Sequence, residues 1–249
     1  MKKNYLEAFL CAFFLGITLL QGQQITEIGS YFSWFDSRVG IENTALYEGI
    51  LYKELYRTIN EKTQFFKSPD FLPGSVMYKG QPYVDLQLKY NVYDDQLLVK
   101  VDNRLGGNTL QLFRDEISEF TLDGALFTHI VGEPVETGIG GFYEVSLEYP
   151  TFQLLTKYSK KLFKRKDRSS LYYEFLEGNE AHVLHYGNQY YPLNRKRDVT
   201  ELFPDLEKQI NDFYNRAMAL RRSDSHAFTV ALLKRIGSLL PQQKSNAFR

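Results

Sequence analysis

Residues 84–92, VDLQLKYNV, alternate apolar and polar side chains with a period of two. This period is typical of a β-strand with one buried face. A second apolar segment follows at 97–101, LLVKV, and Asp94, Asp95 and Gln96 supply turn-forming residues between the two. The stretch therefore predicts an antiparallel hairpin, and similar segments recur on both sides of it.

Strand-like segments continue from about residue 28 to residue 193. Asp123-Gly124 is a hairpin turn signal between the strand-like segments 120–122 and 126–127. Segments 142–147 and 152–155 flank a turn at Tyr149-Pro150-Thr151. We therefore expect at least seven strands joined mainly by short turns.

One aromatic pattern, Tyr-x-Gly-x-x-Tyr, occurs at 47–52 and 78–83, with a shortened form at 186–190. Glycine supports the positive φ of a tight turn, and tyrosines suit cross-strand pairs. We expect three hairpins with tyrosines stabilising the sheet; the alternative is an aromatic platform for a ligand.

The pattern becomes helical near residue 195. Asp198 and Glu201 are spaced as a capping box, and Pro204 suits the first turn of a further helix. Apolar residues then recur at helical spacing at Leu206, Ile210, Phe213, Ala217 and Leu220. A last helix should begin near Ser223-Asp224 and end at Gly237 and Pro241.

Strands followed by helices predict an α+β fold: an antiparallel β sandwich or partly open barrel with two or three C-terminal helices packed on it. The absence of βαβ alternation argues against a doubly wound sheet. We expect a signal peptide at 1–22, a β-rich body at 23–193, a helical segment at 194–241 and a flexible tail at 242–249.

Composition excludes several classes of protein. The chain has 249 residues, of which 15% are aromatic, 17 are glycine and 8 are proline, with one cysteine and 30 basic against 30 acidic residues. A disordered chain would be poorer in aromatics, a disulfide scaffold richer in cysteine, and a typical nucleic-acid binder more basic. We therefore expect a globular protein with no nucleic-acid partner.

The N-terminus has the features of an export signal. Lys2 and Lys3 precede an apolar run at 8–20, which is too short to span a bilayer comfortably, and Gly22 suits a cleavage site. The mature chain should start near Gln23 and have no transmembrane span; the alternative is a buried N-terminal helix. Cys11 lies inside the run, not at the cleavage point, so a lipid anchor is not expected.

Cleavage would remove the only cysteine of the chain. A secreted protein without cysteine suits the envelope of a Gram-negative bacterium better than a eukaryotic secretory route, where disulfides are common. It also excludes thiol catalysis and thiolate metal sites from the mature protein.

No sequence motif specifies a catalytic reaction. Phosphate-loop, dinucleotide, HExxH and GxSxG patterns are absent, and the glycines at 138–141 precede a strand. His182 and His185 should point to opposite faces of one strand, so we do not expect a shared metal, and we expect no cofactor. A hydrolase of this kind would need carboxylates that converge in one cleft. The candidates are two pairs of neighbouring acids, Asp94 with Asp95 and Asp115 with Glu116.

Charge is distributed unevenly. Residues 94–156 contain 11 acids and three bases, whereas 157–168 contain seven bases and one acid. An anionic envelope component or an acidic protein surface could bind such a run; the alternative is a solvated hairpin whose charges protect an edge strand. The candidate partner-binding residues are Lys157, Lys160, Lys161, Lys164, Arg165, Lys166 and Arg168.

Four segments resemble an uncharacterised family of exported β-rich envelope proteins that we associate with Bacteroidota. They read GSVMYKGQPY at 74–83, LKYNVYDD at 88–95, GFYEV at 141–145 and LFPD at 202–205. The resemblance implies an envelope location and a β-rich fold followed by helices. It transfers no catalytic residues.

Three functions remain open. The first is a non-catalytic envelope protein that binds a partner or supports a surface assembly. The second is a periplasmic hydrolase that uses acidic residues. The third is a carrier of an apolar ligand inside a half-open barrel.

Overall fold

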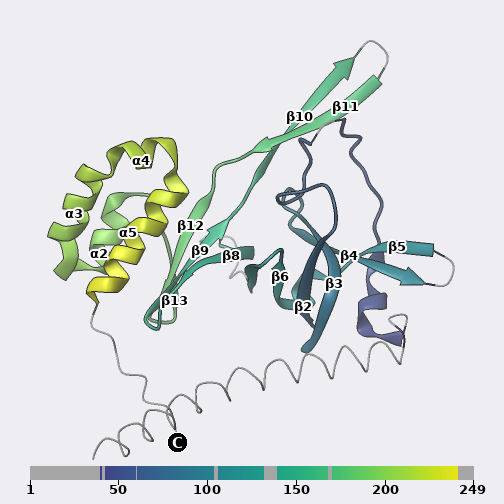
Figure 1. The fold of residues 1–249 in the computed structure, drawn as a ribbon, viewed down its shortest axis with the longest axis horizontal. Helices are drawn as coiled ribbons and strands as arrows, with labels where there is room; N and C mark the ends of the chain where they lie inside the picture. The colour runs from purple at the N-terminus through teal and green to yellow at the C-terminus, as the bar shows by residue number, and fades with distance from the viewer. Residues whose placement is uncertain are drawn as a thin grey trace, which may run out of the picture.

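An eleven-stranded antiparallel sheet forms the framework of the protein, in a computed structural model that describes residues 40, 43–59, 61–103, 106–131, 139–167 and 170–240 (Figure 1). The predicted signal peptide with Cys11, Gly138, Arg168, Pro241 and the predicted tail lie outside the described residues. The strands are β1 (Ile50–Leu51), β2 (Leu72–Tyr78), β3 (Gln81–Asn91), β4 (Gln96–Asn103), β5 (Gly106–Gln111), β6 (Ile117–Leu122), β7 (Ala125–Ile130), β8 (Gly141–Glu148), β9 (Phe152–Lys157), β12 (Ala181–Tyr186) and β13 (Gln189–Pro192).

The sheet is open, with β1 at one end and β13 at the other, in the order β1-β5-β4-β3-β2-β6-β7-β8-β9-β12-β13. Most neighbours are joined by hairpins, so the order follows from local turns. Strand β2 has shifts in register against both of its neighbours, β3 and β6. Such bulges increase twist and curvature, and this part of the sheet curls on itself (Figure 1). The α+β prediction, with a partly open antiparallel sheet, is confirmed.

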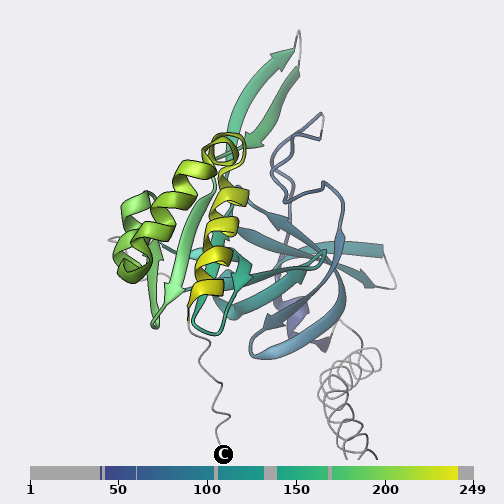
Figure 2. The same ribbon diagram turned by 60° about the vertical axis from the view of Figure 1, so that its left-hand side comes forward.

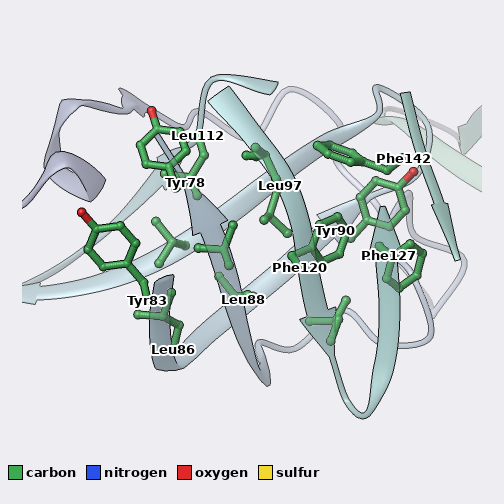
Figure 3. Packing of buried hydrophobic residues seen from close by; sticks show 14 of the residues in the cluster. Tyr78, Tyr83, Leu86, Leu88, Tyr90, Leu97, Leu112, Phe120, Phe127 and Phe142 are labelled. Carbon is green, nitrogen blue, oxygen red and sulfur yellow. The ribbon is translucent and has the colours of Figure 1, made fainter. Parts of the chain in front are cut away.

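Aliphatic and aromatic side chains fill the inside of the curled part (Figure 3). Phe120 and Phe127 stack with ring centroids 4.7 Å apart, and Tyr90 and Phe142 meet Phe120 edge to face. Strand β3 supplies Leu86, Leu88 and Tyr90 to this core, as its alternation predicts.

Two of the three tyrosine patterns form the expected hairpins. Lys79 and Gly80 have positive φ between β2 and β3, and so do Gly187 and Asn188 between β12 and β13. The prediction is wrong for the first pattern, where a 3-10 turn, η2 (Ala45–Glu48), precedes β1.

Gly49 in this first pattern has a negative φ. A Cβ there would lie 2.8 Å from the carbonyl oxygen of Gln111, so glycine allows the backbone at this position to lie close to β5. The chain after Gly49 pairs with a strand some sixty residues away, which the local pattern does not reveal.

The C-terminal helices pack on one face of β9 and β12 (Figure 2). They are α2 (Lys196–Leu202), α3 (Glu207–Arg216), α4 (Met218–Ser223) and α5 (Ser225–Leu239), with a 3-10 turn, η4 (Pro204–Leu206), before α3. Phe152, Leu154 and Leu184 from the sheet join apolar side chains of the helices, including Ile210 and Leu232, in a second core.

Two predicted helix boundaries differ from the structure. Helix α2 begins two residues before Asp198, whose carboxylate accepts backbone N–H bonds from Asn194 and Arg195 at 2.7 Å each. Asp198 is therefore the acid whose side chain binds the backbone N–H groups before the helix, a role that the predicted capping box gave to Glu201. Glu201 instead pairs with Arg197. Helix α5 begins where the sequence predicts, and Asp224 caps it by accepting a hydrogen bond from the backbone N–H of Ala227 at 2.8 Å.

Helix α5 continues through Gly237 to Leu239. Glycine does not end the helix; it leaves room for the ring of Tyr149, which a Cβ at Gly237 would approach to 2.5 Å.

A separate two-stranded sheet is formed by β10 (Lys160–Asp167) and β11 (Ser170–Glu177). It continues the β9–β12 hairpin and extends away from the body in both views (Figures 1 and 2). Among the residues that the structure describes, no helix is both long and apolar enough to cross a membrane.

Candidate functional site

The basic run lies mainly on the projecting β10–β11 hairpin. Five of the seven predicted binding residues are in β10, where most side chains after Leu162 are exposed. Lys157 is at the end of β9, and Arg168 is outside the described residues. The chain therefore presents this charge on a two-stranded arm.

Two of the five cations have acidic partners on the arm. Lys160 pairs with Glu177 across the strands, and Arg165 Nε lies 3.1 Å from Glu174 Oε2. Arg165 and then Lys62 lower the pKa of Glu174 below its usual range. These two cations stabilise the hairpin.

The other three cations are Lys161, Lys164 and Lys166, and all are exposed. Within the described ranges, they form no ion pair. Opposite residues of an antiparallel pair share a face, so Lys164 next to Tyr173 and Lys166 next to Leu171 lie on one face. Lys161 lies on the other.

Apolar side chains are exposed among these lysines. Phe163 is 38% exposed and Leu171 is 42% exposed. Phe163 lies under the guanidinium group of Arg165, at 5.5 Å from its carbon to the ring centroid. The arm thus combines cations with apolar groups, while its outer end is remote from both cores (Figure 1).

An aromatic cluster fixes the base of the arm. Tyr56 meets Tyr173 and Phe175 edge to face at 5.4 and 5.2 Å. The backbone N–H groups of these two β11 residues donate to the carbonyl oxygens of Arg57 and Lys62. These contacts attach the base of the arm to residues 56–62.

Lys157 is set apart from the arm because its ammonium group is half-buried next to Asp95. Nζ lies 2.7 Å from Asp95 Oδ2, and Tyr90 donates its hydroxyl to Oδ1 at 2.6 Å. Burial lowers the pKa of Lys157, although Asp95 opposes this shift. Burial, together with Asp95, raises the pKa of Tyr90. Lys157 is thus part of the fold.

The acids considered for hydrolysis have different surroundings. Asp95 is neutralised by Lys157, and Asp94 accepts a hydrogen bond from the side chain of Asn91 at 2.8 Å. Asp115 is 91% exposed at its side chain, and Glu116 is also exposed. They do not form a pair in a shared cleft. The aromatic packing inside the curled sheet likewise gives no support to a ligand carrier.

A different cluster lies where the arm joins the body. Glu180 precedes β12, His182 is in β12 and His226 is in the first turn of α5. His182 Nε2 lies 3.2 Å from His226 Nδ1, which lies 3.7 Å from Glu180 Oε2. Burial and then His226 lower the pKa of His182 to about 4.

His185 contacts Gln153 and Tyr190 on the other face of β12, so the two strand histidines diverge as predicted. His182 meets a histidine 44 residues away instead. Sequence reasoning missed this cluster, because only the packing of α5 on the sheet brings its members together. An isolated histidine in the first turn of a helix was the only available signal.

Searches of protein-family models, of curated proteins and of solved structures each found no match to this chain. The resemblance to exported envelope proteins stays a prediction, and the candidate sites are described from the geometry alone.

Proposed function

We propose that the protein is an exported, non-catalytic envelope protein that binds an acidic lipid surface through the β10–β11 arm. The observation that carries this proposal is that Lys161, Lys164 and Lys166 are exposed on a separate two-stranded arm and, among the residues that the structure describes, have no acidic partner. Exposed Phe163 and Leu171 favour lipid over a purely polar partner, because apolar groups enter the interface between head groups and acyl chains.

The expected interaction is weak and reversible. Each lysine near an anionic membrane contributes about 1 kcal/mol, and salt screens this attraction. Three lysines and two partly exposed apolar groups therefore suit a contact that positions the protein at a surface. Several copies, or a second contact, would be needed for firm attachment.

Sedimentation with lipid vesicles tests this function. The chain should bind vesicles of phosphatidylglycerol and phosphatidylcholine, but not vesicles of phosphatidylcholine alone, and 0.5 M salt should release it. The triple substitution Lys161→Gln, Lys164→Gln and Lys166→Gln should abolish binding.

A matched control removes three exposed lysines elsewhere: Lys53→Gln, Lys208→Gln and Lys234→Gln. It changes the net charge equally and should leave binding intact. Equal binding by both triple variants would contradict the proposal. Crosslinking of the arm to an acidic protein, with no vesicle binding, would favour the acidic protein surface instead.

Export is the second part of the proposal and has its own test. The chain expressed with its N-terminus in a Gram-negative host should be recovered from the periplasm or the outer membrane. Its mass should correspond to a start at Gln23. Retention in the cytoplasm with the first 22 residues intact would contradict export.

A further inference from the structure

We propose that Glu180, His182 and His226 bind one divalent cation of the zinc class, which joins the base of the arm to helix α5. This site is independent of the lipid contact proposed for the arm.

The three donors come from three different parts of the fold. Glu180 belongs to the three residues, 178–180, that connect β11 to β12. On the opposite side of the hairpin only two residues, Tyr158 and Ser159, connect β9 to β10, so the Glu180 side has one extra residue. Such an extra residue redirects the chain and is common next to functional sites. The other donors are on β12 and α5, so a bound ion would connect the arm, the sheet and the helices.

The donor atoms have suitable chemistry and spacing. Imidazole nitrogen and carboxylate oxygen are both zinc ligands, with bonds of about 2.0–2.2 Å. Neighbouring ligands of a tetrahedral ion then lie about 3.3 Å apart. The two histidine nitrogens are 3.2 Å apart, and all three donor atoms lie within 4.8 Å of one another.

Small side-chain movements complete the site. The two histidines are now in direct hydrogen-bond contact, so both rings must tilt to direct their lone pairs at an ion between them. His226 and Glu180 are partly exposed, at 29% and 34% of their side chains, and have room for this movement. Buried His182 is the fixed member.

The charge of the cluster also fits a cation. Histidines bind a metal ion in their neutral form, so two of them with one carboxylate would carry a net charge of −1. Within the described part of the chain, the only basic side chain within ion-pair distance of Glu180 is His226. Three protein ligands leave one tetrahedral position for water.

Zinc binding can be measured directly. The full chain is prepared without a histidine tag and with Cys11→Ser, which removes its only thiol. Titration against a chromophoric zinc chelator should show one zinc ion per chain, and zinc should raise the melting temperature. Cobalt in place of zinc should give the visible absorption of a tetrahedral site.

The variants assign the ligands. Loss of a partner that only orients a ligand costs about 10–100-fold in metal affinity. His226→Ala and Glu180→Gln, which remove ligands, should therefore each weaken zinc binding at least about 100-fold. The melting temperature of each should no longer respond to zinc. Both residues are partly exposed, so these variants should fold, which circular dichroism of the metal-free proteins checks.

His185→Ala is the control, because it removes a histidine from the opposite face of the same strand. Zinc affinity should be unchanged. The proposal is overturned if the starting chain binds zinc no more tightly than His226→Ala, or if His185→Ala weakens binding equally. Full affinity in Glu180→Gln would also overturn the three-ligand site.

Discussion

Lys157 Nζ lies 2.7 Å from Asp95 Oδ2, and this ion pair joins β9 to the turn between β3 and β4 across 62 residues of sequence. Tyr90 donates to the same carboxylate from inside the aromatic core. The first residue of the basic run therefore holds the curled sheet together, while the later ones are presented to solvent.

Lys157→Met should destabilise the protein by about 2–4 kcal/mol, because it removes the nearer and more buried of the two cations beside a partly buried carboxylate. The other cation, Arg114, lies 3.8 Å from Asp95 Oδ2 and is half-exposed. Methionine keeps much of the side-chain volume, so lost packing contributes little. Urea unfolding measures the free energy. Lys161→Met, on the exposed arm, should change it by less than about 0.5 kcal/mol. Equal effects of the two substitutions would contradict the structural role of Lys157.

Gly141 makes the ion pair possible. Its φ is +90°, and a Cβ there would lie 1.8 Å from Asp95 Oδ2 and 2.5 Å from Lys157 Nζ. Gly141→Ala should therefore be strongly destabilising. Gly124→Ala is the matched control, because Gly124 has a φ of +78° but open space around the added methyl group.

The control isolates backbone strain of about 1–2 kcal/mol. Gly141→Ala should cost about 2 kcal/mol more than this, because it also disrupts the ion pair. If urea unfolding gave the same loss of stability for both variants, the steric argument at Gly141 would be wrong.

The parts of the fold that follow from local chemistry could be predicted from the sequence. The alternation at 84–92, the Asp123-Gly124 turn and the start of the last helix near Asp224 each reflect interactions within a few residues, and each has the expected structure. The basic run is visible in the sequence because its members are neighbours along the chain, but its role in binding stays a prediction, and its first member, Lys157, pairs with Asp95.

Contacts that join distant segments could not be predicted in this way. Gly49 has its role because β5 approaches it, and Gly237 because the ring of Tyr149 does. His182 and His226 meet only after α5 packs on β12. A local pattern contains no information about such neighbours, so it reveals neither the roles of these two glycines nor the histidine cluster.

His129 should make stability depend on pH. Burial lowers its pKa in the folded protein, and its Nδ1 lies 3.0 Å from the carbonyl oxygen of Ile117. As pH falls below about 6.5, the unfolded chain binds a proton before the folded protein does. Titration of His129 therefore lowers the free energy of unfolding as pH falls from about 6.5 through the folded pKa of His129.

His129→Gln removes this titration and retains a side chain that can donate to Ile117. Urea unfolding at pH 8, where the histidine is neutral in both states, gives the baseline difference between the two proteins. Between pH 7 and pH 5 the variant should gain stability relative to the starting chain. Parallel stability curves over this range would argue against a lowered pKa.

Gly237→Ala tests how the helical segment is attached to the sheet. Alanine normally stabilises a helix interior relative to glycine by about 1 kcal/mol. Here the added Cβ would meet three ring atoms of Tyr149 at 2.5–2.8 Å, so we expect a net loss of about 1 kcal/mol. In a Tyr149→Ala background the same substitution should instead stabilise by about 1 kcal/mol.

The double-mutant cycle separates the two effects, because helix propensity acts in both backgrounds and the clash acts only with Tyr149 present. A coupling energy of about 2 kcal/mol would show that the β8–β9 turn presses its tyrosine against α5. If Gly237→Ala stabilised both backgrounds equally, Tyr149 would be free to move away. The glycine would then be a simple defect in the helix, and the turn would not hold α5 against the sheet.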